Sequence, residues 1–213
     1  AALHAGRSGA RVILADEQNE FGGWLLAEND TSIEGMDADD WIAEMVAKLT
    51  VMPEVTLLPR TTVFGYMDHN YLTLVERVTD HLAKRPAHLP RQRLWKVRAS
   101  QTVLAQGAHE RPLVFSGNDL PGVMLAGAVR QFINRFGVLP GNRAIVVTNN
   151  DDAYRTALTL DAAGANVVVV DLRISAAGPL ITAARDARIE IMAGHAVTLA
   201  HGNHRVARVE ISP

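Results

Sequence analysis

The clearest structural signal in this sequence is the stretch Arg11-Val12-Ile13-Leu14-Ala15-Asp16-Glu17. Its short apolar centre is typical of a buried strand. The residues from Ala1 onward have the character of a helix. That helix is expected to end between Gly6 and Gly9, where glycine can supply the left-handed backbone of a helix end. A helix that leads into an apolar strand predicts a βαβ unit with a parallel sheet.

Two carboxylates, Asp16 and Glu17, stand at the end of this strand. In a dinucleotide-binding βαβ unit, a carboxylate at the end of the second strand accepts hydrogen bonds from the hydroxyls of the adenosine ribose. Two negative charges would repel a 2′-phosphate, which favours NAD or FAD over NADP. An exposed Asp-Glu turn is an equally good interpretation of the pair alone.

Three nearby features fit a nucleotide site in the same way. Gly22-Gly23 allows a close approach of the backbone to a ligand, and Trp24 could cover a ribose or an adenine. The alternative is a simple turn that precedes Leu25 and Leu26. Val63 ends a short extended segment and could offer its backbone to an adenine edge, although most valines in such strands belong to the core.

The rest of the first half predicts one helix and a run of strands. Residues 37–49 place apolar side chains on one helical face, with Asp37, Asp39 or Asp40 available as the N-cap. Residues 55–58 and 63–66 resemble short strands, 72–78 and 93–98 an antiparallel hairpin, and 102–105 a further buried strand. We expect a dinucleotide-binding domain at 1–125 that lacks its first strand and its glycine-rich loop.

A second unit is expected at 126–213. A helix at 126–136 precedes strand 144–148, helix 153–163 and strand 167–171, and a helix at 180–187 and short strands follow. The turn at 148–153 contains no glycine. Asp151 and Asp152, which we expect to cap the helix, would repel a pyrophosphate there, so this domain is predicted to be degenerate and unable to bind a dinucleotide.

These elements predict an α/β fold with two Rossmann-like dinucleotide-binding units in series and an antiparallel β-meander inserted in the first. The chain has 213 residues and a formal net charge of −2, without the basic runs that nucleic acids or anionic lipids attract. No apolar stretch approaches a membrane span. We therefore expect neither nucleic acid nor membrane as a partner.

The side chains that usually carry out chemistry are sparse. With no cysteine, the chain has no disulfide, thiolate metal site or cysteine nucleophile, and a cytoplasmic location is the default expectation. The eight histidines are scattered, and His201 and His204 have no carboxylate at a useful spacing, so we expect no metal site. No residue is predicted to be catalytic.

A family resemblance runs through most of the chain. The segments that carry it are 103–112 (Val-Leu-Ala-Gln-Gly-Ala-His-Glu-Arg-Pro), 118–123 (Asn-Asp-Leu-Pro-Gly-Val), 62–66, 68–71, 93–95 and 12–23. As a set they resemble the alpha subunits of heterotetrameric sarcosine oxidases. The resemblance implies disulfide-reductase-like nucleotide-binding domains with NAD bound in the first, and FAD and FMN elsewhere in a complex with other subunits.

The resemblance also implies roles for individual residues. Asp16 and Glu17 would bind the adenosine ribose, Gln18 and Trp24 would lie beside the nucleotide, Val63 would meet the adenine, and Gly107 would approach the nucleotide. The complex would oxidise sarcosine with oxygen to glycine, formaldehyde and hydrogen peroxide. Two alternatives remain open: the corresponding subunit of an opine or amino-acid dehydrogenase, and an assembly scaffold that binds no nucleotide.

Overall fold

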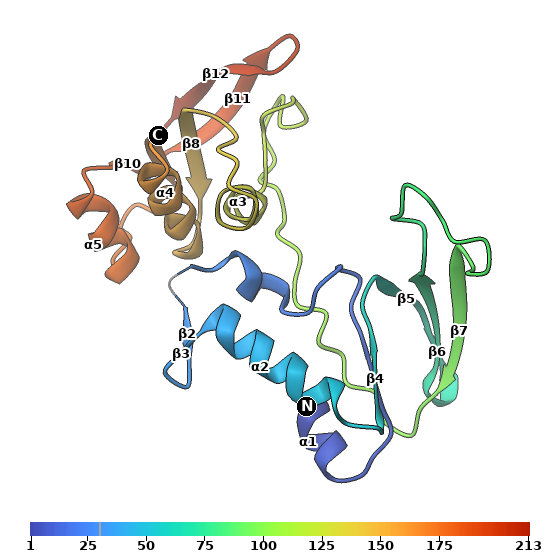
Figure 1. The fold of residues 1–213 in the computed structure, drawn as a ribbon. Helices are drawn as coiled ribbons and strands as arrows, with labels where there is room; N and C mark the ends of the chain where they lie inside the picture. The colour runs from blue at the N-terminus through green and yellow to red at the C-terminus, as the bar shows by residue number, and fades with distance from the viewer. Residues whose placement is uncertain (30) are drawn as a thin grey trace. The chain divides into compact units, whose positions relative to one another are not determined.

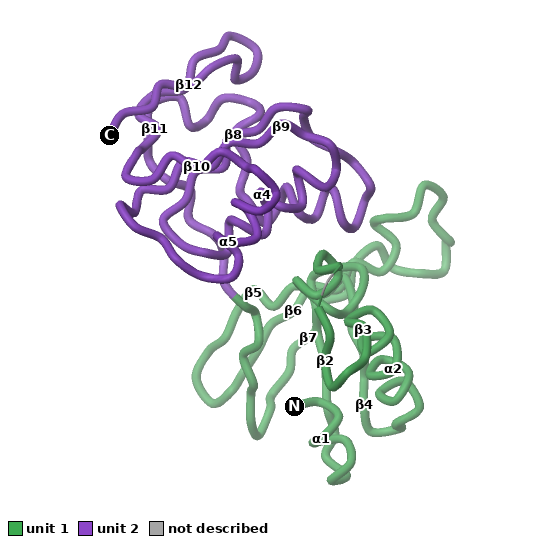
Figure 2. The backbone as a smooth tube through the Cα atoms, turned by 90° about the vertical axis from the view of Figure 1, so that its left-hand side faces the viewer, with its two compact units in different colours: residues 1–107 green, residues 108–213 purple. Residues whose placement is uncertain are grey.

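The chain folds into two compact units, Ala1–Gly107 and Ala108–Pro213 (Figure 2). This computed structural model describes residues 1–29 and 31–213. The sequence analysis placed the boundary after residue 125. Residues 108–125 belong with the second unit because they bond to its C-terminal strands: the Ala200 N–H donates to the Ser116 carbonyl at 2.8 Å, and the Val206 N–H to the Pro121 carbonyl at 2.9 Å.

A pair of parallel strands forms the centre of the first unit. Helix α1 (Ala2–Arg7) leads into β1 (Val12–Ala15), which pairs in parallel with β4 (Val55–Leu58), so that Ala15 lies opposite Leu58. Between these strands come a 3₁₀ helix, η1 (Gly23–Ala27), a short β2–β3 hairpin (Ser32–Ile33 and Met36–Asp37) and helix α2 (Figure 1). The predicted helix and parallel strand are confirmed.

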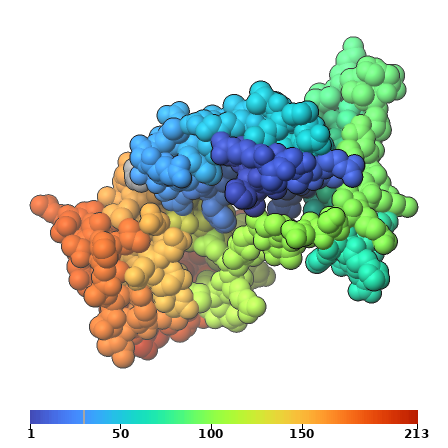
Figure 3. Space-filling model, turned by 90° about the horizontal axis from the view of Figure 1, so that it is seen from below, coloured from blue at the N-terminus to red at the C-terminus, as the bar shows by residue number. Residues whose placement is uncertain are grey.

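Helix α2 (Ala38–Thr50) covers this small sheet from one side. Its N-cap is Asp37, whose carboxylate accepts a hydrogen bond from the Asp39 N–H at 2.9 Å, so the structure selects one of the three carboxylates proposed as caps. The helix buries Ile42 and Leu49. Helix α1 lies against it on the face shown in Figure 3.

The antiparallel meander is confirmed, with three strands. They are β5 (Thr61–Met67), β6 (Tyr71–Arg77) and β7 (Gln92–Arg98), with a short 3₁₀ turn, η2 (Asp68–Asn70), between the first two. The predicted strand at 102–105 is wrong. Val103 and Leu104 are 71% and 61% exposed, and no described strand pairs with these residues. Apolar character alone does not make a strand without a pairing partner.

The second unit has the predicted element order. Helix α3 (Ala126–Arg130) continues as a π-helical turn, η3 (Gln131–Arg135), and is followed by β8 (Arg143–Thr148), α4 (Asp152–Ala162) and β9 (Asn166–Asp171). Helix α5 (Pro179–Asp186) leads to β10 (Glu190–Ala193), giving a parallel sheet in the order β10-β9-β8. An antiparallel pair, β11 (Ala196–Gly202) and β12 (Val206–Ser212), ends the chain.

The core of the second unit lies between helices α4 and α5 and the parallel sheet. Tyr154, Ala157, Val169, Ile181 and Ala184 are completely buried. Four of these side chains come from helices α4 and α5 and one, Val169, from β9, as expected where helices cover a parallel sheet.

Candidate functional site

The two predicted ribose-binding carboxylates follow β1 directly. The backbone of Asp16 joins two other segments: its N–H donates to the Leu58 carbonyl at 3.0 Å, and its carbonyl accepts from the Thr61 N–H at 2.7 Å. Its Oδ1 accepts the Gln18 N–H at 2.8 Å. Within the described residues, Oδ2 of Asp16 and the Glu17 carboxylate accept no hydrogen bond. Carboxylate oxygens at this strand end are thus available to accept hydroxyl donors.

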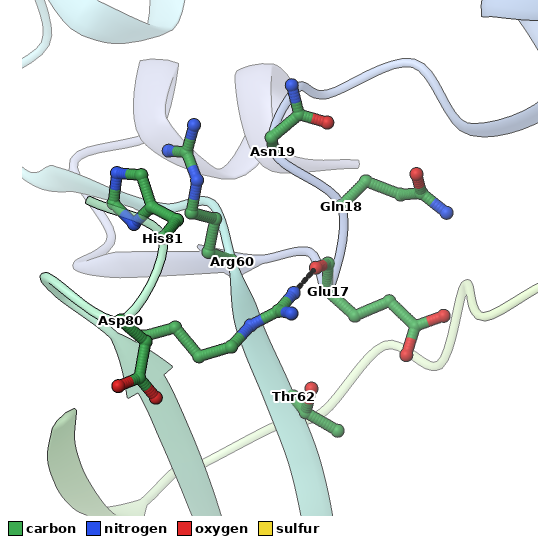
Figure 4. A pocket seen from close by; sticks show the side chains of 8 residues that line it. Glu17, Gln18, Asn19, Arg60, Thr62, Asp80 and His81 are labelled. Carbon is green, nitrogen blue, oxygen red and sulfur yellow. Dashed lines mark hydrogen bonds between the residues drawn. The ribbon is translucent and has the colours of Figure 1, made fainter. Parts of the chain in front are cut away.

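An open hollow of about 670 Å³ lies beside these carboxylates (Figure 4). Three segments of the first unit line it, and their residues are Glu17, Gln18, Asn19, Arg60, Thr62, Arg77, Asp80 and His81. Arg60 joins the segments through its backbone: its N–H donates to the Gln18 carbonyl at 2.7 Å, and its carbonyl accepts from the Arg77 N–H at 3.0 Å. The Arg77 guanidinium donates to the Glu17 carbonyl at 2.6 Å. The walls of the hollow are therefore held together by backbone hydrogen bonds.

The hollow includes some of the predicted site residues and not others. Glu17 and Gln18 line it, next to Asp16. Trp24 lies in η1 and is 41% exposed, and Val63 lies on β5 and is 44% exposed. Gly107 is the last residue of the first unit, with φ at 70°. The last three do not line the hollow, and their roles beside a nucleotide stay predictions.

Besides Asn19 and Thr62, four lining residues were not predicted from the sequence: Arg60, Arg77, Asp80 and His81. They come from the β4–β5 turn and from the end of β6 onwards. No local motif marks them, because Arg60 reaches this segment through its backbone bond to Gln18, and the other three reach it through the pairing of β5 with β6, in which Thr61 lies opposite Glu76. Arg60 alone has an unusual backbone, with φ at 54°, but this is not visible in the sequence.

Gly22 has a packing role that does not require a ligand. A Cβ atom added there would lie 2.8 Å from Cδ1 of Ile42 and 2.9 Å from Cγ of Leu26. Its φ of 136° is also one that side chains rarely adopt. Glycine at this position lets η1 pack closely on α2, so Gly22 gives no independent support for the nucleotide interpretation.

In the second unit, the carboxylate at the equivalent strand end is already occupied. Asp171 ends β9 and is fully buried. It accepts hydrogen bonds from the Tyr154 hydroxyl at 2.8 Å and from the Arg173 guanidinium at 2.8 and 3.0 Å. Burial alone would raise the pKa of Asp171, but the hydrogen bonds from Arg173 and Tyr154 outweigh it and lower that pKa. Burial, with the bond to Asp171, raises the pKa of Tyr154 to about 12.

Asp151 occupies the N-cap position of α4, as expected, but neither its side chain nor that of Asp152 caps the helix. Asp151 has helical backbone angles, φ −81° and ψ −26°, from which its side chain makes no capping bond. The Asn150 side chain accepts the Asp152 N–H at 3.0 Å instead. Both carboxylates bind arginines: Asp151 pairs with Arg173 at 2.7 Å and Asp152 with Arg130 at 2.9 Å.

The described residues form neither a metal-binding cluster nor a membrane-spanning helix. In residues 1–29 and 31–213, no three histidine or carboxylate side chains gather into a group that could hold a metal ion. None of the helices in the described part of the chain has the length and apolar character that crossing a bilayer requires.

Comparison with known sequences gives clear relatives, although no family model matches the chain. The alpha subunit of sarcosine oxidase from Rhizobium meliloti (strain 1021) is 50% identical over 177 residues, which are 83% of this chain and 18% of that protein. An opine oxidase subunit from Agrobacterium tumefaciens (strain Ach5) is 28% identical over 80% of this chain and 34% of its own length. The chain thus spans only a small part of these relatives.

Comparison with solved structures identifies the fold. The crystal structure of L-proline dehydrogenase from P. horikoshii matches 98% of this chain and 35% of its own, with a TM-score of 0.69 and 21% sequence identity. This likeness confirms the predicted Rossmann-like α/β fold class. With three matches at about 50% identity over most of its length, the chain belongs to the sarcosine oxidase alpha-subunit family, of which it spans less than a fifth of the full length.

Proposed function

We propose that this chain is the NAD-binding part of the alpha subunit of a sarcosine oxidase. The observation that carries the proposal is the pair of available carboxylates after β1, in a chain that shares half its aligned residues with sarcosine oxidase alpha subunits. The order of β1, α2 and β4 supports the proposal, because Rossmann-like folds bind an adenosine ribose with a carboxylate at the end of such a strand.

In this proposal, Oδ2 of Asp16 and the carboxylate of Glu17 accept the two ribose hydroxyls. Gln18 and Trp24 lie beside the nucleotide, and the backbone of Val63 and Gly107 approaches it. The side chain of Trp24 is exposed enough to cover a ring, and Val63 is half-exposed on β5. The binding chemistry is therefore hydrogen bonding to a neutral ribose together with apolar cover.

The complete assembly would oxidise sarcosine. One sarcosine, one water and one oxygen molecule give glycine, formaldehyde and hydrogen peroxide, and the two electrons pass from the N-methyl group to oxygen. We propose that FAD and FMN carry those electrons elsewhere in a heterotetramer with other subunits, and that this part of the chain supplies no catalytic residue. NAD held here would be a bound cofactor that is not turned over.

Titration of NAD into the full-length protein tests the ribose assignment. Asp16→Ala removes a charged acceptor, and the loss of such hydrogen bonds costs about 1.5–3 kcal/mol, so NAD should bind roughly tenfold to a hundredfold more weakly. Asp68→Ala is the matched control, since Asp68 is an exposed carboxylate of the same unit at the turn after β5. Equal NAD affinities for wild type and Asp16→Ala would contradict the assignment of Asp16 to the ribose.

A second substrate class has one observation in its favour, the 28% identity to an opine oxidase subunit. Oxygen consumption by the native assembly with sarcosine, and then with an opine, separates the two. The same preparation tests the scaffold hypothesis, because an assembly scaffold would retain no nucleotide in its first unit when the native complex is analysed by mass spectrometry.

A further inference from the structure

We propose that the hollow beside Glu17 binds a phosphate group of a ligand, with Arg60 as its principal contact. This inference goes beyond the proposed function, because the proposed NAD contacts use carboxylates and a neutral ribose, whereas the hollow offers cations. It rests on the side chains that line the hollow and on what each of them already binds.

The backbone of Arg60 is held in place, whereas its side chain has no partner in the described residues. Its backbone is fixed by hydrogen bonds at both its N–H and its carbonyl. Within the described residues, its guanidinium makes no hydrogen bond or ion pair. Figure 4 shows that guanidinium between the labelled side chains of His81 and Asn19, while the carboxylates of Glu17 and Asp80 extend away from it. A fixed, half-buried and unpaired guanidinium is well suited to receive an anion.

Two further donors line the same hollow. Arg77 uses one guanidinium nitrogen on the Glu17 carbonyl and keeps its other N–H groups for a ligand. The Thr62 hydroxyl has no hydrogen-bond partner in the part of the chain that the structure describes. Guanidinium and hydroxyl donors from different segments match the several oxygens of a phosphate.

One of the two carboxylates in the lining, that of Asp80, does not cancel these cations. Asp80 is bound by Arg91 and Gln92, and Gln92 Nε2 donates to its Oδ2 at 2.5 Å. The hydrogen bond from Arg91 is the largest cause that lowers the pKa of Asp80, followed by that from Gln92. Asp80 and Arg91 thus form a neutral pair, and Glu17 is the other carboxylate in the lining, with Asp16 next to it.

The size of the hollow indicates more than a bare phosphate ion. At about 670 Å³ it has the dimensions of a small-molecule site. Asp16 and Glu17 alone would repel a phosphate on the ribose of a nucleotide held by Asp16, so such a phosphate requires Arg60 and Arg77 to offset that repulsion. The alternative source is a separate phosphorylated small molecule. The chemistry that the hollow recognises is the same in both cases.

Calorimetric titration of the full-length protein in its native assembly tests the proposal, in a phosphate-free buffer at constant ionic strength. Inorganic phosphate is the first probe. Adenosine 2′,5′-bisphosphate, compared with adenosine 5′-monophosphate, is the second and reports a ribose phosphate. We expect Arg60→Gln to lower the affinity for inorganic phosphate by about tenfold or more. If the ligand is a nucleotide, the variant should instead lose the higher affinity for the bisphosphate over the monophosphate. Arg11→Gln is the matched control, an exposed arginine at the opposite end of β1.

The two probes distinguish the sources of the phosphate. A gain from the 2′-phosphate that depends on Arg60 identifies a nucleotide ribose, whereas phosphate binding that persists with saturating NAD identifies a separate ligand. Titrations that are identical for wild type and Arg60→Gln overturn the proposal. Failure of NAD to bind would contradict the proposed function but not this one, because inorganic phosphate does not require Asp16.

Discussion

Asp171 shows how one buried carboxylate can be kept charged. Burial by itself disfavours the charged form, but Arg173 and Tyr154 hydrogen-bond to that form, and their effect lowers the pKa below its usual value. The folded protein therefore holds the Asp171 proton less tightly than the unfolded chain. The stabilisation is fully present above the unfolded pKa of about 3.9 and is lost as the pH falls from there through the folded pKa.

We predict that the stability of the Asp171→Asn variant falls less steeply in acid than the stability of the wild type does. The variant should be less stable at pH 7, because Arg173 loses a charged partner, and it should lose less further stability in acid than wild type does. Amide hydrogen exchange over α4 and β9 in the intact protein, compared between variants at each pH, measures this. Asp119→Asn changes an exposed carboxylate and should keep the wild-type profile. Parallel profiles for wild type and Asp171→Asn would contradict the assigned role.

The contact between η1 and α2 depends on Gly22. Gly22→Ala combines backbone strain with crowding against Ile42 and Leu26, whereas Gly9→Ala introduces strain alone, since nothing lies within 4 Å of its added Cβ. Overpacking typically costs about 1–3 kcal/mol, so Gly22→Ala should destabilise the first unit by about that much more than Gly9→Ala. Hydrogen exchange over residues 38–50 reports the difference. Equal effects of the two variants would show that the packing tolerates a methyl group.

The sequence predicted the elements whose signal is local. Helix α2 follows from its apolar spacing and Asp37, and the β8-α4-β9 unit from two short apolar strands around an amphipathic helix. Residues 102–105 have the same apolar character as β1 but form no strand, because strand formation depends on a neighbour that local sequence cannot supply. The side chain of Asp151 makes no capping bond for a similar reason: its carboxylate binds Arg173, a residue that is distant in the sequence.

At the scale of the whole chain, only one of the segments around the candidate site could be predicted from the sequence. Asp16, Glu17 and Gln18 form one segment after one strand, so topology alone places them. Arg60 joins them through its backbone hydrogen bond to Gln18, and Arg77 and His81 join them because β6 returns beside β5. Cations and carboxylates from distant segments therefore meet in a place that no linear motif describes.

The two units should differ in nucleotide binding despite their similar strand order. In the first, Asp16 keeps a carboxylate oxygen available, whereas in the second, Asp171 is buried under Tyr154 and Arg173, and Asp151 holds the same arginine. We therefore expect NAD to bind these two units at a stoichiometry of one, in the first unit, and Asp16→Ala to weaken that single event. Titration of the intact protein, with electron density for the retained nucleotide, provides the measurement. Two results would contradict this expectation and show that the second unit opens its buried ion pair to a ligand. One is nucleotide density against Asp171. The other is a second binding event that persists in Asp16→Ala and disappears in Asp171→Asn.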